Sequence, residues 1–168
     1  MMAKLIVDGK EFDIEILDPK LQEIIAPKKK TGYEPVGKNE YYWIVNEESK
    51  LIYVQERSDD EDTLFYSTAN YYESEFVAAQ NARADTLMRQ MRRFAVERRK
   101  NSLDWENFNR VKWCIAYGCG TNELCLSESG LVKRHGVIYF DDPEDAKAAI
   151  ETFRNELIWY FTEYKDSL

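Results

Sequence analysis

The same order of sequence signals occurs twice along this chain, and no other feature limits its fold as strongly. Each copy has an aromatic strand signal, a polar turn, a second strand signal and a loop, followed by an aromatic pair that opens an Ala-rich helix. Trp43 and Trp113 lie 70 positions apart, and Tyr72 and Phe140 lie 68 apart. A near-constant offset is the signature of an internal repeat. We therefore expect an α+β fold with two tandem ββ(β)α repeats and antiparallel sheets, in which each helix covers one sheet face.

The repeats divide the chain into three parts. We expect a first repeat over residues 41–100 and a second over residues 101–168, preceded by an N-terminal segment at 1–40. In that segment an Asp-Gly pair at 8–9 lies between two apolar runs, which is a strong β-hairpin signal. An Asp-Pro pair at 18–19 is typical of a helix start. The segment is thus expected to contribute an N-terminal β-hairpin, a short helix and a linker.

Apolar residues at helical spacing predict two amphipathic helices. The first is expected to start near Ser74 and to run to about Lys100. The second is expected to have Asp142 as its N-cap, directly before a proline. Ile158 and Trp159 fall outside the apolar stripe of the second helix. This pair is expected either to form an exposed contact patch or to pack against the N-terminal hairpin.

The overall charge is acidic, with 23 Lys and Arg residues against 31 Asp and Glu residues and a net charge of −8. Such a balance disfavours unspecific contact with nucleic acid or with an anionic membrane. No apolar run approaches the roughly 18 residues of a membrane span. The first acidic residue comes too early for a signal peptide. We therefore expect a protein without a membrane partner that stays in the cell that makes it.

The sequence contains no recognisable catalytic or metal-binding motif. It lacks the P-loop, G-x-S-x-G, H-E-x-x-H and G-x-G-x-x-G patterns. Cys114, Cys119 and Cys125 lack the two close pairs of a structural zinc site, so reduced thiols are expected. His135 lies in a basic loop before a predicted strand at 137–139 and is expected to be exposed. We expect no enzyme activity, cofactor or metal.

One expected helix is strongly basic. From residue 83 to residue 100, only Asp85 and Glu97 oppose seven basic residues, which are Arg83, Arg89, Arg92, Arg93, Arg98, Arg99 and Lys100. Arginine forks suit phosphate or an acidic partner. The alternative is a solvated helix face that pairs with the acidic remainder of the chain.

A short acidic run lies between the second strand signal and the first long helix. It consists of Asp59, Asp60, Glu61 and Asp62. The run lacks the spacing and the glycine of a calcium-binding loop. It is expected either to present negative charge to a basic partner or to be a self-repelling surface loop.

Four stretches of this sequence resemble a group of small hypothetical proteins encoded in phages and prophages of gut Firmicutes. They are KKKTGYEPVGKNEYYWI (28–44), ARADTLMRQMRRFAVERRK (82–100), DWENFNRVKWCIAY (104–117) and IYFDDPEDAKAAIETFRNELIWYFTEYKDSL (138–168). The resemblance implies a mobile-element protein in a bacterial cytoplasm. Because acidic, compact phage proteins without catalytic motifs are often inhibitors of host defence, including anti-CRISPR proteins, it also implies an anti-defence role by analogy.

Two functions follow as hypotheses. The first is a non-enzymatic mobile-element protein that binds a host protein, including a defence nuclease, through Asp59, Asp60, Glu61, Asp62, Ile158 and Trp159. The second is a nucleic-acid-binding accessory factor in phage replication or recombination. It would use Arg89, Arg92, Arg93, Arg99 and Lys100 of the basic helix.

Overall fold

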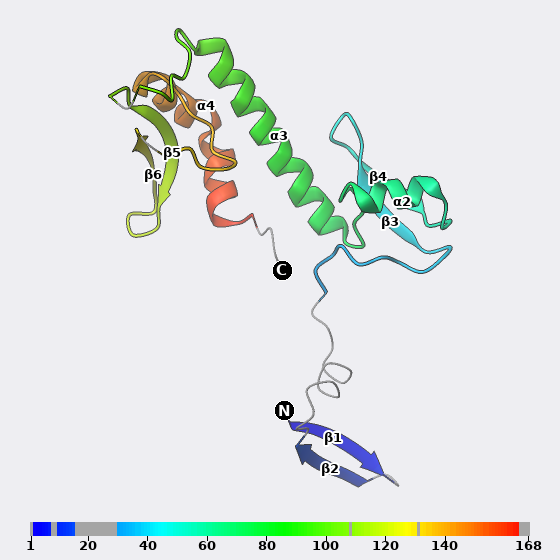
Figure 1. Ribbon diagram of the computed structural model, residues 1–168. Coiled ribbons are helices and arrows are strands. Elements are labelled where there is room, and N and C mark those ends of the chain that lie inside the picture. The colour runs from blue at the N-terminus through cyan, green and yellow to red at the C-terminus, as the bar shows by residue number, and fades with distance from the viewer. Residues whose placement is uncertain (1, 8–9, 16–29, 108, 131, 165–168) are drawn as a thin grey trace.

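The fold is α+β (Figure 1), and the computed structural model describes residues 2–7, 10–15, 30–107, 109–130 and 132–164. In chain order the elements are β1 (Met2–Val7), β2 (Lys10–Glu15), β3 (Tyr41–Val45), β4 (Leu51–Gln55), α2 (Asp60–Ser67), α3 (Glu75–Arg98), β5 (Lys112–Gly118), β6 (Glu123–Ser129) and α4 (Pro143–Thr162). No helix among these described residues is long and apolar enough to cross a membrane.

The strands pair as three separate two-stranded antiparallel sheets. β1 pairs with β2, from Met2 opposite Glu15 to Val7 opposite Lys10, and this pair does not extend the edge of another sheet. β3 pairs with β4, and β5 pairs with β6. The expected turn at 8–9 and the expected short helix that begins at 18–19 lie outside the described residues.

The third strand expected in each half is reduced to a single bridge. Trp43 and Tyr72 exchange two backbone hydrogen bonds of 2.8 and 2.9 Å. Trp113 and Phe140 exchange two more, of 2.9 and 2.8 Å. The predicted strand at 137–139 is therefore not formed. Each bridge ties the first strand of a hairpin to an aromatic residue three positions before the start of a long helix.

Helices α3 and α4 begin where the capping residues predict. The side chain of Ser74 accepts a hydrogen bond from the amide of Val77 (3.4 Å), and that of Asp142 accepts one from the amide of Glu144 (2.9 Å). A side-chain oxygen at this position satisfies an amide that has no partner within the helix. Both predicted helix starts are confirmed.

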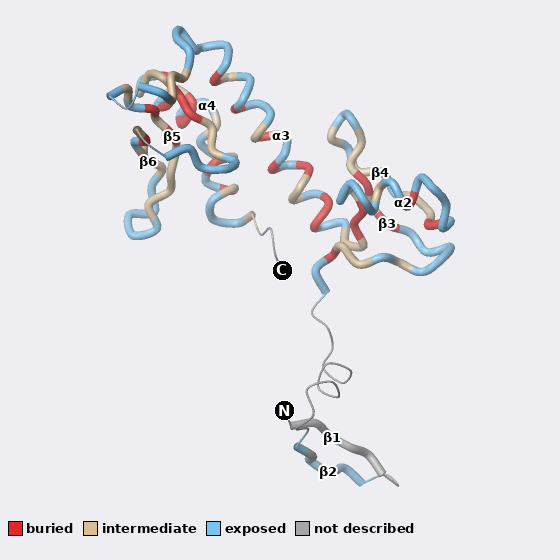
Figure 2. Tube along the Cα trace, in the orientation of Figure 1, coloured by how far each residue is buried: buried red, intermediate tan, exposed pale blue. Residues whose placement is uncertain are grey.

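Helix α3 contributes to hydrophobic clusters near both of its ends. Its first turns pack Val77 and Ala78 against Tyr72, and its last turns pack Ala95 against Phe140. Between them, Leu87 and Met91 of α3 pack with Leu157 of α4. Figure 2 shows these buried positions along most of α3, with the β3–β4 hairpin and α2 near its N-terminal end. Burying one such Leu or Met side chain stabilises the fold by about 1.5–3 kcal/mol.

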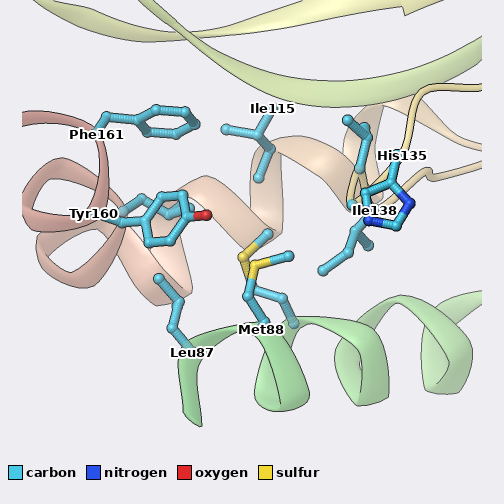
Figure 3. Close-up of a pocket in the computed structure, with 11 residues that line it drawn as sticks. Leu87, Met88, Ile115, His135, Ile138, Tyr160 and Phe161 are labelled. Atoms are coloured by element: carbon cyan, nitrogen blue, oxygen red, sulfur yellow. The ribbon is translucent and has the colours of Figure 1, made fainter. Parts of the chain in front are cut away.

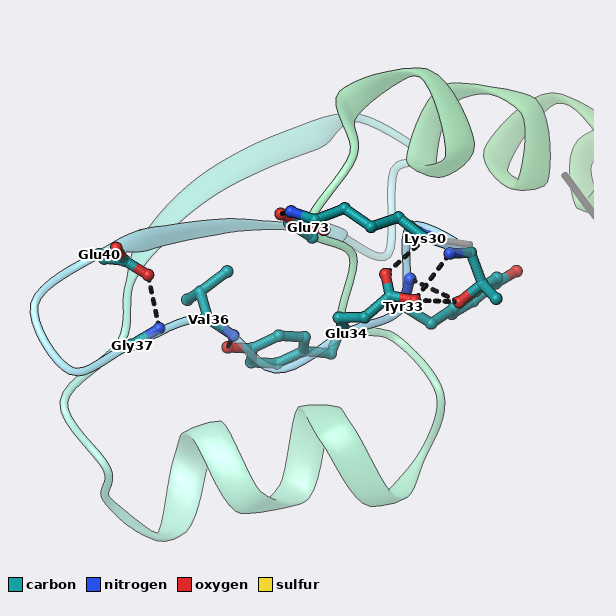
Figure 4. Close-up of polar contacts among 10 residues, drawn as sticks. Lys30, Tyr33, Glu34, Val36, Gly37, Glu40 and Glu73 are labelled. Atoms are coloured by element: carbon teal, nitrogen blue, oxygen red, sulfur yellow. Dashed lines mark hydrogen bonds and ion pairs between the residues drawn. The ribbon is translucent and has the colours of Figure 1, made fainter. Parts of the chain in front are cut away.

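The chain before β3 is held in place by backbone-to-carboxylate hydrogen bonds (Figure 4). The carboxylate of Glu34 accepts from the amides of Thr31 (2.6 Å) and Gly32 (2.8 Å), and that of Glu40 accepts from the amide of Gly37 (2.6 Å). The bond from the Thr31 amide is the largest reason why the pKa of Glu34 falls to about 2. A salt bridge between Lys30 and Glu73 ties this segment to the start of α3.

Gly32 is the one position in this segment that requires a glycine. Its φ of +87° is a conformation that side-chain-bearing residues rarely adopt. A Cβ atom at this position would lie 2.6 Å from Cγ2 of Val77, which is buried. The carbonyl of Gly32 accepts hydrogen bonds from the amides of Glu73 (2.8 Å) and Ser74 (3.4 Å). The sharp turn at Gly32 thus brings the segment against the N-terminus of α3.

Candidate functional site

The acidic run begins a helix and is not a surface loop, which corrects the expectation from the sequence. Asp59 is the N-cap of α2, and its carboxylate accepts from the amides of Glu61 (3.0 Å) and Asp62 (3.1 Å). Asp62 reaches back to the amide of Asp59 (3.2 Å) and completes a capping box. Asp60 and Glu61 lie exposed in the first turn, where the helix dipole favours negative charge.

Asp62 cannot serve as an accessible surface charge, because only 5% of it is exposed. Its carboxylate accepts from the hydroxyl of Tyr42 (2.6 Å) and from the amide of Arg57 (2.8 Å). Burial opposes its ionisation, but these hydrogen bonds outweigh burial and lower the pKa of Asp62 to about 2. Asp62 is therefore an ionised structural residue that ties α2 to β3.

A second buried carboxylate, Glu56, lies in the same cluster. It accepts from the hydroxyl of Tyr71 (2.8 Å) and from the amide of Ser58 (2.8 Å). The rings of Tyr42 and Tyr71 stack with their centroids 3.8 Å apart. Burial raises the pKa of Tyr71 to about 12, so its hydroxyl stays protonated as a donor. Because the oxygens of both carboxylates accept hydrogen bonds, the cluster is structural.

The expected exposed patch at Ile158 and Trp159 is wrong for Trp159. Trp159 is only 4% exposed, whereas Ile158 is 38% exposed. The guanidinium of Arg83 covers the Trp159 ring and forms a bidentate ion pair with Glu156, at 2.7 and 3.0 Å. Trp159 thus packs under α3, and this contact replaces the expected packing against the N-terminal hairpin.

Most of the seven basic residues between positions 83 and 100 pair within the protein. Arg83 pairs with Glu156, Arg98 with Asp145 (3.5 Å), Lys100 with Asp142 (3.5 Å) and Arg93 with Glu97 (3.7 Å). Arg89 donates to the hydroxyls of Ser49 and Thr86. Early residues of α3 meet late residues of α4 and the reverse, so the two helices are antiparallel. The remaining basic residues, Arg92 and Arg99, have no ion pair within the described part of the chain.

Arg92 and Arg99 line a groove between the C-terminal half of α3 and the segment 132–139. The groove has a volume of about 520 Å³. Lys133 and His135 line it from the segment side, and Trp105 forms part of its wall. None of the described residues that line it is acidic. In a chain with a net charge of −8, this groove is a local concentration of positive charge.

The wall of the groove is held by Trp105 and Tyr139. Their rings meet edge to face, with centroids 4.9 Å apart. The ammonium groups of Lys112 and Lys133 lie 5.1 and 5.8 Å from the centre of the Trp105 ring, a cation–π arrangement. The Tyr139 hydroxyl accepts from the amide of Arg134 (2.9 Å), which anchors the basic segment.

Lys112 is a buried cation behind this wall. It is 1% exposed, and its ammonium donates to the carbonyl of Asn107 (3.1 Å). No carboxylate in the described part of the chain lies within salt-bridge distance of it. A buried charge without a counter-ion is costly, and a hydrogen bond to a carbonyl offsets only part of that cost. Here it adds positive potential behind the groove.

An apolar hollow of about 270 Å³ adjoins the groove (Figure 3). Leu87 and Met88 of α3 form its floor, Ile115 of β5 lies opposite them, and Tyr160 and Phe161 of α4 close one end. The other end is the segment 135–138. The same four residues, His135, Gly136, Val137 and Ile138, also line the basic groove. The two depressions therefore share a wall.

The structure brings together only part of the predicted basic site. Arg92 and Arg99 meet in the groove, whereas Arg89, Arg93 and Lys100 have other partners on other faces. Sequence reasoning missed Lys133 and Trp105 as site residues and placed His135 correctly as exposed without assigning it a role. The signal that could have found Lys133 is the basic run 133–135, whereas no local signal connects it with Trp105, which lies 28 residues earlier.

No metal-binding cluster is present among the described residues, and the three cysteines are free thiols. Cys114 is buried, which raises the pKa of its thiol, and it donates to the carbonyl of Ser127 (3.5 Å). Cys119 and Cys125 are exposed.

Comparison of the chain with protein-family models, with curated protein sequences and with solved structures gave no match. The groove and the hollow beside it are therefore the features of the described residues from which we infer a function.

Proposed function

We propose that this chain is a non-enzymatic binding protein that engages an anionic partner through the groove between α3 and the segment 132–139. The observation that carries the proposal is the convergence of Arg92, Arg99, Lys133 and His135 from two distant parts of the chain, in a groove without an acidic lining residue. Charge complementarity of this kind raises association rates and selects the partner.

The partner in this proposal is a host protein with an acidic surface. The resemblance to phage and prophage proteins supports a bacterial cytoplasmic setting and a component of host defence, such as a nuclease, as the target. The acidic run 59–62 does not support this interaction, since Asp62 and Asp59 are engaged within α2. The recognition surface is thus moved from the acidic run to the basic groove.

A non-enzymatic role is supported by the setting of His135. A general base needs an orienting partner and a substrate proton within reach. His135 has no hydrogen-bond partner in the described part of the chain, and no Ser, Thr or Cys lies among the described groove residues. Its role in the proposal is to line the groove as a polar, exposed side chain.

Nucleic-acid binding is the second candidate, and the groove's unpaired Arg92 and Arg99 favour it. In this case the contacts come from Arg92, Arg99 and Lys133, whereas Arg89 and Arg93 of the sequence hypothesis lie on other faces. Phosphate contacts of this kind make affinity fall steeply with salt.

The recurrence of element order supports an internal duplication as part of the proposal. Each half has a hairpin, a bridge from Trp to an aromatic residue, and a capped helix. The groove lies where the two halves meet, because the first half supplies Arg92 and Arg99 and the segment 132–139 of the second half supplies Lys133 and His135.

A pull-down from host lysate tests the proposal, with and without nuclease treatment. The groove variant carries Arg92→Glu and Lys133→Glu. The matched control carries Lys147→Glu and Arg154→Glu, which reverse two exposed charges of α4 outside the groove. We expect a host protein that survives nuclease, binds the control variant and is lost from the groove variant.

Other outcomes separate the candidates. Recovery that disappears with nuclease and depends on the groove variant would assign the groove to nucleic acid. Equal recovery of the same proteins by wild type, groove variant and control would overturn the proposed function.

A further inference from the structure

The apolar hollow in Figure 3 has no role in the binding of charge, yet it shares the wall 135–138 with the basic groove. We infer that this hollow takes one large apolar side chain from an acidic segment of the partner protein, while neighbouring carboxylates of that segment lie in the groove. The inference rests on the proposed function and specifies its partner.

Size restricts the occupant. The hollow has a volume of about 270 Å³. Sites for whole small-molecule ligands usually have volumes of about 300–1,000 Å³. A hollow below that range fits a single Phe, Leu, Ile or Met side chain better than a complete cofactor.

The chemistry of the lining favours an apolar side chain over a nucleobase. The side chains of Leu87, Met88, Met91, Ile115 and Leu157 supply no hydrogen-bond donor, and their only acceptors are the weak thioether sulfurs of the two methionines. The side-chain polar groups at the hollow are the Tyr160 hydroxyl and the His135 ring, at opposite ends of it. A base buried there would lose hydrogen bonds to water without replacement, at a cost of about 1–3 kcal/mol per polar group. Methionines adapt to different apolar shapes, which suits a side-chain anchor.

The positions of Arg92, Arg99 and Lys133 determine where the partner's peptide must carry its acidic residues. Because His135 to Ile138 separate the hollow from the groove, carboxylates next to the anchor residue in sequence can reach Arg92, Arg99 and Lys133. An apolar anchor in a pocket, surrounded by charged contacts, is the usual arrangement of an interface hot spot. The observations thus fit an acidic peptide segment with one central apolar residue.

Synthetic peptides test this inference with the intact protein. The probe is a ten-residue peptide of Glu, Asp, Gly and Ser with one central Phe. It is compared with the same peptide carrying Ala in place of Phe, and with a version in which Lys replaces every acidic residue. We expect the Phe peptide to bind wild type at least about tenfold more tightly than the Ala peptide, as burial of an aromatic side chain predicts. The Lys version should not bind.

Two variants locate the anchor. Met88→Glu places a charge in the hollow and should remove the advantage of Phe over Ala, whereas the volume-conserving Met88→Leu should keep it. Phe76→Ser is the matched control, because Phe76 is an exposed apolar residue of the same helix (53%) far from the hollow. Far-UV circular dichroism on each variant verifies folding.

The outcomes distinguish this inference from the proposed function. If both acidic peptides bind wild type equally and lose binding with Arg92→Glu/Lys133→Glu, the inference of an apolar anchor is wrong, whereas the proposed function of the groove is supported. If neither acidic peptide binds wild type, both are wrong. A single-stranded thymidine oligonucleotide whose binding depends on Met88, or 4-phenylbutyrate binding as tightly as the Phe peptide, would also overturn the peptide assignment.

Discussion

The guanidinium carbon of Arg83 lies 3.9 Å from the centre of the Trp159 ring, while the same guanidinium donates two hydrogen bonds to Glu156. One side chain of α3 thus covers an aromatic ring of α4 and forms a bidentate ion pair with a carboxylate one helical turn before that ring. Both the bidentate ion pair and the stacking on the ring depend on the planar guanidinium group, which Lys does not have.

Replacing Arg83 should weaken the α3–α4 contact. We expect Arg83→Ala to lower the free energy of unfolding by about 1 kcal/mol, since the pair is half exposed and a cation–π contact is lost as well. Arg83→Lys should recover less than half of this loss. Arg154→Ala, which breaks an ion pair within α4, should change stability by about 0.5 kcal/mol or less. Urea unfolding curves measure all three.

Tyr42→Phe should destabilise the hairpin β3–β4 and α2. The change removes the donor to the buried carboxylate of Asp62 and leaves that oxygen unsatisfied, at a cost of about 1–3 kcal/mol. Tyr66→Phe alters an exposed hydroxyl and serves as the control. Equal stability of both variants by thermal unfolding would contradict a structural role for the pair.

Asp62 also predicts acid sensitivity. Its pKa in the folded protein, about 2, is lower than the ordinary value of 3.8. A depressed pKa stabilises the fold at pH values above the unfolded pKa, and this stabilisation is lost as the pH falls from about 4 to about 2. We expect a contribution on the order of 1–2 kcal/mol. Asp62→Asn should flatten that part of a pH–stability curve, and a curve identical to wild type would rule out the assignment.

Gly32→Ala should be destabilising by about 2 kcal/mol, because Ala is strained at a positive φ and its Cβ meets the buried Val77. Gly120→Ala is the matched control. No atom lies within 4 Å of a Cβ at that position, so little change is expected. A melting temperature of Gly32→Ala equal to that of the control would show that the turn relaxes.

Lys112→Met should separate stability from binding. Replacing a buried, unpaired ammonium by an apolar side chain of similar length should leave stability unchanged or raise it by about 1 kcal/mol. Affinity of the groove for an acidic peptide should nevertheless fall, since a positive charge behind its wall is lost. Lys38→Met removes the same charge at an exposed site and should leave both properties unchanged.

Local signals in the sequence were sufficient to predict where the long helices start. Ser74 and Asp142 act on amides two or three residues away, so their effect is visible within one turn. The acidic run 59–62 carried the same kind of signal, an Asp followed three residues later by another Asp, but its charge obscured the capping box. The helix α2 was missed for that reason.

Contacts between residues far apart in the sequence determine the burial of Trp159 and the position of Arg92 and Arg99, and local sequence signals do not reveal such contacts. Trp159 lies off the stripe that faces its own sheet, so the sequence leaves open an exposed patch or packing against the N-terminal hairpin. Neither is found, because Arg83 of α3 covers the Trp159 ring. Helical spacing places Arg92 and Arg99 on one flank, apart from Arg89 and Arg93, but it does not show that this flank lines a groove. The segment 132–139 selects them, and it approaches from more than 30 residues away.

Helix α3 packs into hydrophobic clusters near both of its ends, so the parts of the chain before and after it cannot be separated without exposing core residues. At 24 residues, α3 is about 36 Å long. It is one continuous helix between its contact with Tyr72 and its contact with Phe140. A cut between residues 100 and 101 would leave the second half with α4 uncovered, exposing Leu157 and Trp159 to solvent. Hydrogen exchange should therefore find the middle amides of α3 opening together with those of α4, as one cooperative unit.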